Sequence, residues 1–137
     1  MAIDFYTGAF ADNLRLAKSK AIISPSDDTY NVIRIPKNAF VTDVWLEVID
    51  VPDVKPLTCE VGWTGNKETA VSSGFITTDV ADAGVAGLKR AQKDTLVTFE
   101  GKYFNNGTGG ITFTYSSGVG ATELGTFRVF VSYIVVH

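Results

Sequence analysis

The sequence of 137 residues has very few of the residues that form covalent cross-links, metal sites or catalytic bases. It contains one cysteine, Cys59, so an intramolecular disulfide and a Cys-based zinc site are both excluded. Its single histidine is His137, the last residue, so a nucleophile activated by a buried histidine is not expected. We therefore expect no catalytic residues, no metal ion and no cofactor.

The sequence also lacks an excess of positive charge and a long apolar run. Twelve basic residues face 15 acidic ones, giving a net charge of −3, which argues against nucleic-acid binding driven by phosphate neutralisation. No run of about 18 apolar residues is present, so we expect no membrane partner. The first residues lack the basic and apolar regions of a secretory signal, so we expect a soluble domain made inside the cell.

What the chain does have is a β-rich composition. It contains 16 Val, 9 Ile and 15 Thr against 7 Leu, and β-branched side chains suit a pleated sheet better than a helix. Thirteen glycines, with Asn, Asp and Ser clusters, supply turns. The length fits one domain. We predict an all-β, jelly-roll-like sandwich of two sheets over residues 25–137, preceded by an extended N-terminal arm over residues 1–24.

Alternation of apolar and polar residues marks the strands. In residues 40–49, Phe40, Val44, Leu46 and Val48 are expected on one face, together with Thr42, and the acidic residues on the other. In residues 126–136, Phe127, Val129 and Val131 are expected inside. The strands are expected over residues 30–36, 40–49, 57–64, 97–103, 111–115 and 126–136.

Two segments do not follow this alternation. Residues 65–94 form an irregular excursion with a short strand near Phe75 and an Ala-rich stretch that could hold a short helix, and such long excursions are often functional or interfacial. Residues 130–136 are apolar on both faces, which indicates burial on both sides, inside the domain or against a partner. Residues 105–110 are predicted to form a hairpin loop.

Several residues have chemistry that two interpretations explain. Asp43 and Glu47 share a strand face and could serve as an acid/base pair, although solvated surface charges explain them more simply. Trp63 is expected in the core beside Cys59 and Val61. Trp45 interrupts an acidic face, which favours an interface or a covering loop as much as partial exposure. Trp45, Trp63, Tyr30 and the other aromatic residues could also form a sugar-stacking platform or an interface anchor.

Three segments together resemble the small structural proteins of tailed-bacteriophage virions, especially capsid decoration or cement proteins. They are residues 32–48 (VIRIPKNAFVTDVWLEV), Val61-Gly62-Trp63 and residues 125–133 (GTFRVFVSY). The resemblance implies a jelly-roll-like fold, self-association on the particle and binding to the major capsid protein. It implies a location on the capsid surface after assembly in the host cytoplasm, and no catalytic residues.

On this hypothesis, apolar and basic residues without an obvious place in the core form two interfaces, and a homo-oligomer, preferably a trimer, is expected. The expected capsid interface consists of Phe5, Tyr6, Phe10, Phe75, Lys89 and Arg90. The expected self-association surface consists of Trp45, Phe130, Ile134 and Val136. Two alternatives remain open: a carbohydrate-binding or tail- or fibre-associated module that uses Trp45, and an enzyme that uses Asp43 and Glu47.

Overall fold

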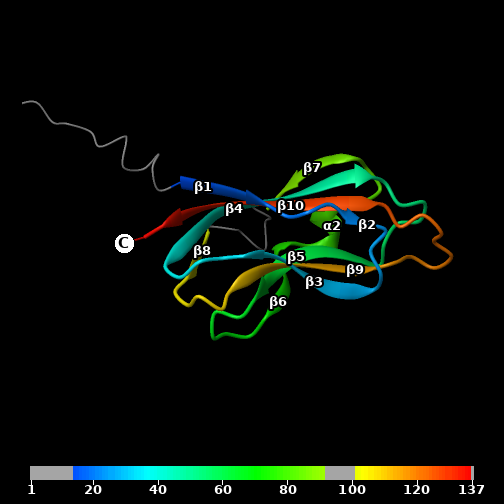
Figure 1. Cartoon of the computed structure of the whole chain (residues 1–137). Coiled ribbons are helices and arrows are strands. Elements are labelled where there is room, and N and C mark those ends of the chain that lie inside the picture. The colour runs from blue at the N-terminus through cyan, green and yellow to red at the C-terminus, as the bar shows by residue number, and fades with distance from the viewer. Residues whose placement is uncertain (1–13, 92–100, 137) are drawn as a thin grey trace, which may run out of the picture.

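The computed structural model describes residues 14–91 and 101–136, which fold into two packed antiparallel sheets (Figure 1). Sheet A has the order β1-β10-β4-β7, with β2 also paired to β10 and β8 also paired to β4. Sheet B has the order β3-β9-β5-β6. The elements are β1 (Leu14–Lys18), β2 (Ile22–Ile23), β3 (Asp28–Arg34), β4 (Ala39–Asp50), β5 (Thr58–Thr64), β6 (Val71–Ile76), α2 (Thr78–Ala81), β7 (Gly87–Arg90), β8 (Lys102–Phe104), β9 (Gly110–Ser116) and β10 (Thr126–Val135). The prediction of an all-β sandwich is confirmed.

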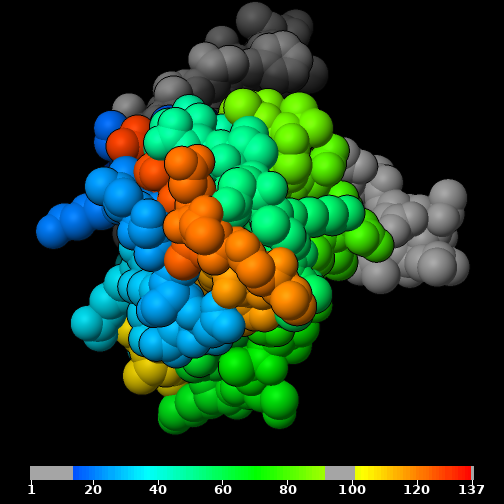
Figure 2. All heavy atoms as spheres, turned by 90° about the vertical axis from the view of Figure 1, so that its right-hand side faces the viewer, coloured from blue at the N-terminus to red at the C-terminus, as the bar shows by residue number. Residues whose placement is uncertain are grey.

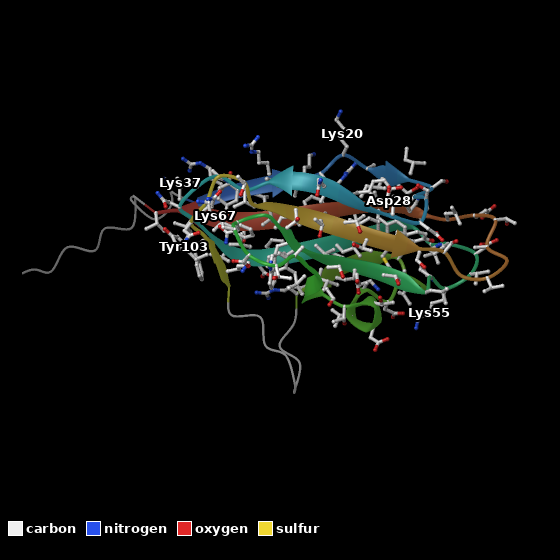
Figure 3. All side chains as sticks on the ribbon, turned by 90° about the horizontal axis from the view of Figure 1, so that it is seen from below. Lys20, Asp28, Lys37, Lys55, Lys67 and Tyr103 are labelled. Carbon is white, nitrogen blue, oxygen red and sulfur yellow. The ribbon has the colours of Figure 1, made fainter. Side chains whose placement is uncertain are left out.

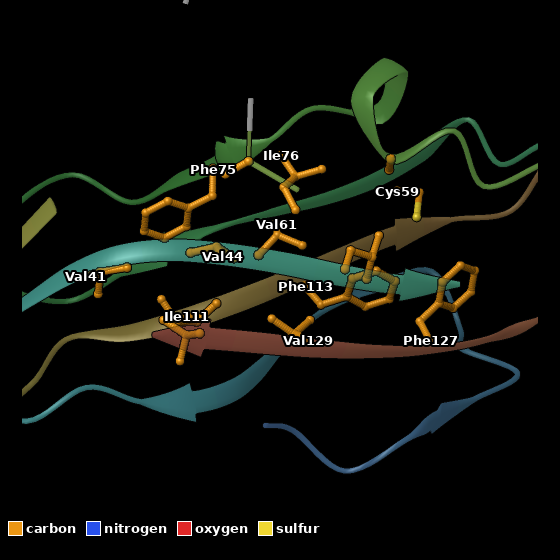
Figure 4. Close-up of a cluster of buried hydrophobic side chains, with 14 of the residues drawn as sticks. Val41, Val44, Cys59, Val61, Phe75, Ile76, Ile111, Phe113, Phe127 and Val129 are labelled. Carbon is orange, nitrogen blue, oxygen red and sulfur yellow. The ribbon is translucent and has the colours of Figure 1, made fainter. Parts of the chain in front are cut away.

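The core lies between the two sheets and consists of the inward residues of their long strands (Figure 4). Phe127, Val129 and Val131 of β10 are fully buried, as the alternation predicts. Phe113 of β9 packs against Phe127 with ring centroids 5.3 Å apart. Tyr115 is also buried, and its hydroxyl donates to the Leu124 carbonyl oxygen at 3.0 Å, so this phenol has a partner inside the protein.

The alternation of β4 changes at a β-bulge, which the sequence analysis did not anticipate. Ser132 pairs with Asp43 but Tyr133 pairs with Val41, so Thr42 is an extra residue in β4. The Thr42 hydroxyl donates to the Ser132 carbonyl oxygen at 3.1 Å. Because of the bulge, Val41 and Val44 both face the core. The expectation that Phe40 shares the inner face of Val44 was therefore wrong.

The segment over residues 65–94 is more regular than predicted. Its described part, to residue 91, contains β6, α2 and β7, and β7 extends sheet A beside β4. The single helical turn begins after Thr77, whose hydroxyl accepts from the Val80 N–H, and it ends at Asp82, which has φ of 40°. The short strand expected near Phe75 corresponds to β6, whereas β7 was missed because this four-residue edge strand, GLKR, is too short for clear alternation.

The loop over residues 105–110 does not close a hairpin, contrary to the prediction. Its flanking strands belong to different sheets, because β8 pairs with β4 and β9 pairs with β3 and β5. The buried Asn66 stabilises this connection between the two sheets. Its side-chain oxygen accepts from the backbone N–H of Asn106 at 3.0 Å, and its backbone N–H donates to Thr108 Oγ1 at 3.2 Å.

The start of the described chain also belongs to the sandwich. Leu14–Lys18 and Ile22–Ile23 pair in succession with β10, so the described part of the expected arm is extended and forms an edge of sheet A. Residues 117–125, which precede β10, lie across the end of the sandwich and are shown in orange in Figure 2. The Ser24 N–H donates to the Gly125 carbonyl oxygen at 2.8 Å, and the Asp53 N–H donates to that of Glu123 at 2.9 Å.

Truncation of Phe113 is expected to destabilise the protein by about 3–5 kcal/mol, because Phe113→Ala leaves a cavity between the sheets. Urea unfolding would measure the change. The matched control is Leu57→Ala, whose side chain is 66% exposed and whose loss should change stability by less than about 0.5 kcal/mol. Equal effects of the two variants would contradict this placement of the core.

Candidate interaction surface

The outer faces of the two sheets differ in chemistry. On sheet B, Thr29 and Thr114 of neighbouring strands share a hydroxyl–hydroxyl hydrogen bond of 3.0 Å, and Ser72 donates to Glu60 at 2.6 Å. On sheet A, the outward positions of five strands, β1, β4, β7, β8 and β10, carry large apolar residues. We call this set the apolar face: Leu14, Leu16, Phe40, Trp45, Leu88, Tyr103, Phe130 and Ile134.

The centre of the apolar face is a row of side chains that crosses the strands. Phe130 of β10 pairs directly with Trp45 of β4, and both are half-buried. Leu16 of β1 and Leu88 of β7 lie diagonally beside them, because Leu16 is in register with Ser132 and Leu88 with Glu47, and they are 72% and 59% exposed. These four side chains line a shallow groove of about 230 Å³, which we call the apolar groove.

A second row lies nearer the end of β10. There Ile134 pairs with Leu14 on one side and with Phe40 on the other, and Phe40 pairs with Tyr103. Leu14 and Tyr103 are exposed. Tyr103 appears near the end of the molecule in Figure 3, whereas charged side chains such as Lys20 and Lys55 project outward elsewhere.

Charged residues lie among and beside these apolar side chains. Asp43 is only 7% exposed because the guanidinium of Arg90 pairs with its carboxylate. Asp43 also accepts from the Val44 N–H at 2.9 Å. Glu47 lies 4.0 Å from Arg128. The expectation that Asp43 is a solvated charge was therefore wrong, because the neighbouring strand supplies a cation that covers it.

The structure brings the predicted self-association residues together. Trp45, Phe130 and Ile134 share the apolar face, and Val136 lies exposed just beyond the end of β10. Leu16 and Leu88 complete the groove but were not predicted. The alternation of Leu14 and Leu16 with Arg15 was a signal for the first of them, whereas Leu88 lies in a four-residue strand with no clear pattern.

The predicted capsid-interface residues do not form one group. Phe75 is 5% exposed and packs edge-on against Trp63 at 5.2 Å, so the expectation that it has no place in the core was wrong. Lys89 and Arg90 point to opposite sides of β7: Lys89 donates to the Asp82 carbonyl oxygen at 3.1 Å, and Arg90 lies beside Trp45. Phe5, Tyr6 and Phe10 lie outside the described residues.

Trp63 is partly buried against the core, as predicted, and its ring is in contact with a cation. The Lys102 ammonium lies 4.1 Å from the ring centroid and also pairs with Glu68. The Lys102 hydrogen bond is the main reason why the pKa of Glu68 is lowered below its usual value of 4.5. These contacts link β5, β8 and the turn after β5. The Trp63 ring therefore contacts a cation of the same chain.

Other chemical features of the described residues are few. Burial raises the pKa of the Cys59 thiol to about 12, so it stays protonated and unreactive. Among residues 14–91 and 101–136, no group of three His, Cys, Asp or Glu side chains could hold a metal ion. Within the same ranges, no helix has the length and apolar character needed to cross a membrane.

Comparison with solved structures finds three similar chains, and two of them come from bacteriophage capsids. One comes from the capsid asymmetric unit of cyanophage Pam1, with a TM-score of 0.65 and 20% identity, covering 90% of this chain and 86% of that one. The other comes from the acid-stable capsid of Helicobacter pylori bacteriophage KHP30, with a TM-score of 0.63 and 18% identity, covering 89% and 87%. No protein-family model and no curated protein matches the sequence. At these identities the chains share a fold.

We expect the Glu68–Lys102 pair to stabilise the protein at neutral pH and to stop doing so in acid. Because the folded-state pKa of Glu68 is lowered, its contribution is present above pH 4.5 and is lost as the pH falls through the folded-state value. Glu68→Gln should therefore be less stable than the unaltered protein at about pH 7, and the difference should narrow at about pH 3. Urea unfolding at both pH values measures it; a gap that widens in acid would contradict this role.

Proposed function

We propose that this chain is a structural protein of a bacteriophage virion that binds the major capsid protein on the head surface and stabilises the particle without catalysis. One observation carries the proposal: a fold shared with chains from two phage capsids presents a large apolar face. The sequence resemblance to decoration or cement proteins supports the same role.

The apolar face has the properties of a protein–protein interface. Monomeric proteins rarely expose contiguous apolar patches of more than a few hundred Å². Two aromatic residues, Trp45 and Phe130, lie at the centre of the face, and aromatic anchors surrounded by polar residues are typical of interfaces. The polar outer face of sheet B lacks this character and is suited to contact with water.

Self-association through the apolar face, preferably as a trimer, fits a role on a particle. A capsid surface repeats each binding site many times, and linked copies bind with an avidity that exceeds the affinity of one site. We assign the contact between copies to Trp45, Phe130, Ile134 and Val136, and part of the contact with the particle to residues 1–12 and Arg90.

The proposed function predicts saturable binding to particles of the parent phage that lack this protein. Co-sedimentation should reach a fixed number of copies per particle, and the loaded particles should withstand heat or chelator better than bare ones. Deleting residues 1–12 should reduce binding with little change in the thermal melt. A folded full-length protein that shows no binding would refute the capsid role.

The proposed self-association predicts a discrete oligomer in light scattering across a concentration series. Phe130→Ser should weaken association by about tenfold or more, because it removes an anchor from the centre of the apolar face. Leu57→Ser is the matched control, since it removes an exposed apolar side chain outside that face. An oligomer weakened equally by both variants would place the contact elsewhere.

A further inference from the structure

We propose that the apolar groove receives the N-terminal segment, residues 1–12, of a second copy of the chain. This inference rests on the self-association proposed above and identifies which part of one copy contacts the other. The groove is open in the described chain and crosses four strands, from Leu16 on β1 to Leu88 on β7. Adjacent strands are about 4.8 Å apart, so the groove is about 14 Å wide across the strands. Leu16 and Leu88 are also offset along the strands, so the diagonal is about 20 Å and about six extended residues could span it.

The N-terminal segment has the chemistry that the groove would bind. It contains Ile3, Phe5, Tyr6 and Phe10, and these large apolar side chains are spaced closely enough for several to reach the groove at once. Burial of one such side chain contributes about 1.5–3 kcal/mol before ordering costs. Aromatic anchors that enter an apolar groove beside Trp45 and Phe130 are a common way to dominate an interface.

The charge of this segment also suits the groove. Residues 1–12 carry two acidic residues, Asp4 and Asp12, and no Lys or Arg. At the groove, Lys18 is in register with Phe130 at one end of the aromatic pair, whereas Arg90, in register with Trp45 at the other end, already pairs with Asp43. An acidic segment seated on the groove therefore brings opposite charge to Lys18.

The path of the chain favours a groove on a second copy. β1 is antiparallel to β10, and Leu14 pairs with Ile134 near the end of that strand, whereas the groove lies further along at Phe130. A chain that continues β1 backwards in the extended direction leads away from its own groove. Twelve residues reach up to about 40 Å when extended, which is enough to arrive at a neighbouring molecule.

A segment exchanged in this way would connect self-association to particle binding. Deleting residues 1–12 would dissolve the oligomer, and the loss of multivalent binding would then lower the amount of protein on the particle. The contact between copies and the contact with the particle would depend on the same residues.

Disulfide trapping in the full-length protein tests the inference. One tagged copy carries Thr7→Cys, which keeps all the apolar anchors of the segment, and a differently tagged copy carries Leu88→Cys at the groove. Cys59 is buried and protonated, so it should not compete. After mild oxidation, we expect the mixed disulfide dimer at a yield at least fivefold higher than with the control Asn31→Cys, an exposed position on sheet B.

Each other outcome overturns the inference in a distinct way. A bond that forms only within one chain, in a variant carrying both substitutions, would show that the segment occupies its own groove. A yield no higher than that of Asn31→Cys, in samples that light scattering shows to be oligomeric, would refute segment exchange and leave self-association standing. The same low yield in monomeric samples would refute both.

Discussion

The pairing of β4 with β10, including the bulge at Thr42, is the constraint on which the rest of the structure depends. These are the two central strands of sheet A, and they carry Val44, Leu46, Phe127 and Val129 into the core. A strand of strict period two that buries Ala39 and Val41 would next turn Asp43, Trp45 and Glu47 toward the core. The buried residues are instead Val44, Leu46 and Val48. The extra residue at Thr42, bonded back to Ser132, corrects the alternation. It also turns Phe40 and Trp45 outward together.

The bulge helps to make both faces of sheet A apolar, because Phe40 and Trp45 point outward while Val41 and Val44 stay in the core. A two-sheet sandwich needs apolar residues only on its inner faces, and sheet B follows this rule with threonines outside. Sheet A has a second apolar layer outside, formed from five strands that are far apart in the sequence. Stability of the isolated domain does not require that layer, so a contact with another molecule is its simplest physical cause.

The sequence predicted the long strands well and the edges poorly, for physical reasons. Phe127, Val129 and Val131 alternate cleanly because β10 is central and half of its side chains must avoid water. Phe75 was misplaced because β6 is a small-residue edge strand in which only its last two residues are buried. The burial of Asp43 depends on Arg90, which is 47 positions away. A sequence pattern extends over only a few residues, so it could not reveal this contact. The groove was missed for the same reason, because its lining residues come together only when the strands pair.

The arrangement of charges on the apolar face bears on how such a surface can exist in a free protein. A flat apolar sheet face with an open edge invites unspecific strand pairing and aggregation. Here Arg90–Asp43 and Arg128–Glu47 hold charges among the aromatic residues, and the edges of sheet A are made of short strands. A partner must therefore bring both apolar side chains and groups that tolerate these charges. This requirement favours contact with a complementary partner over unspecific apolar association.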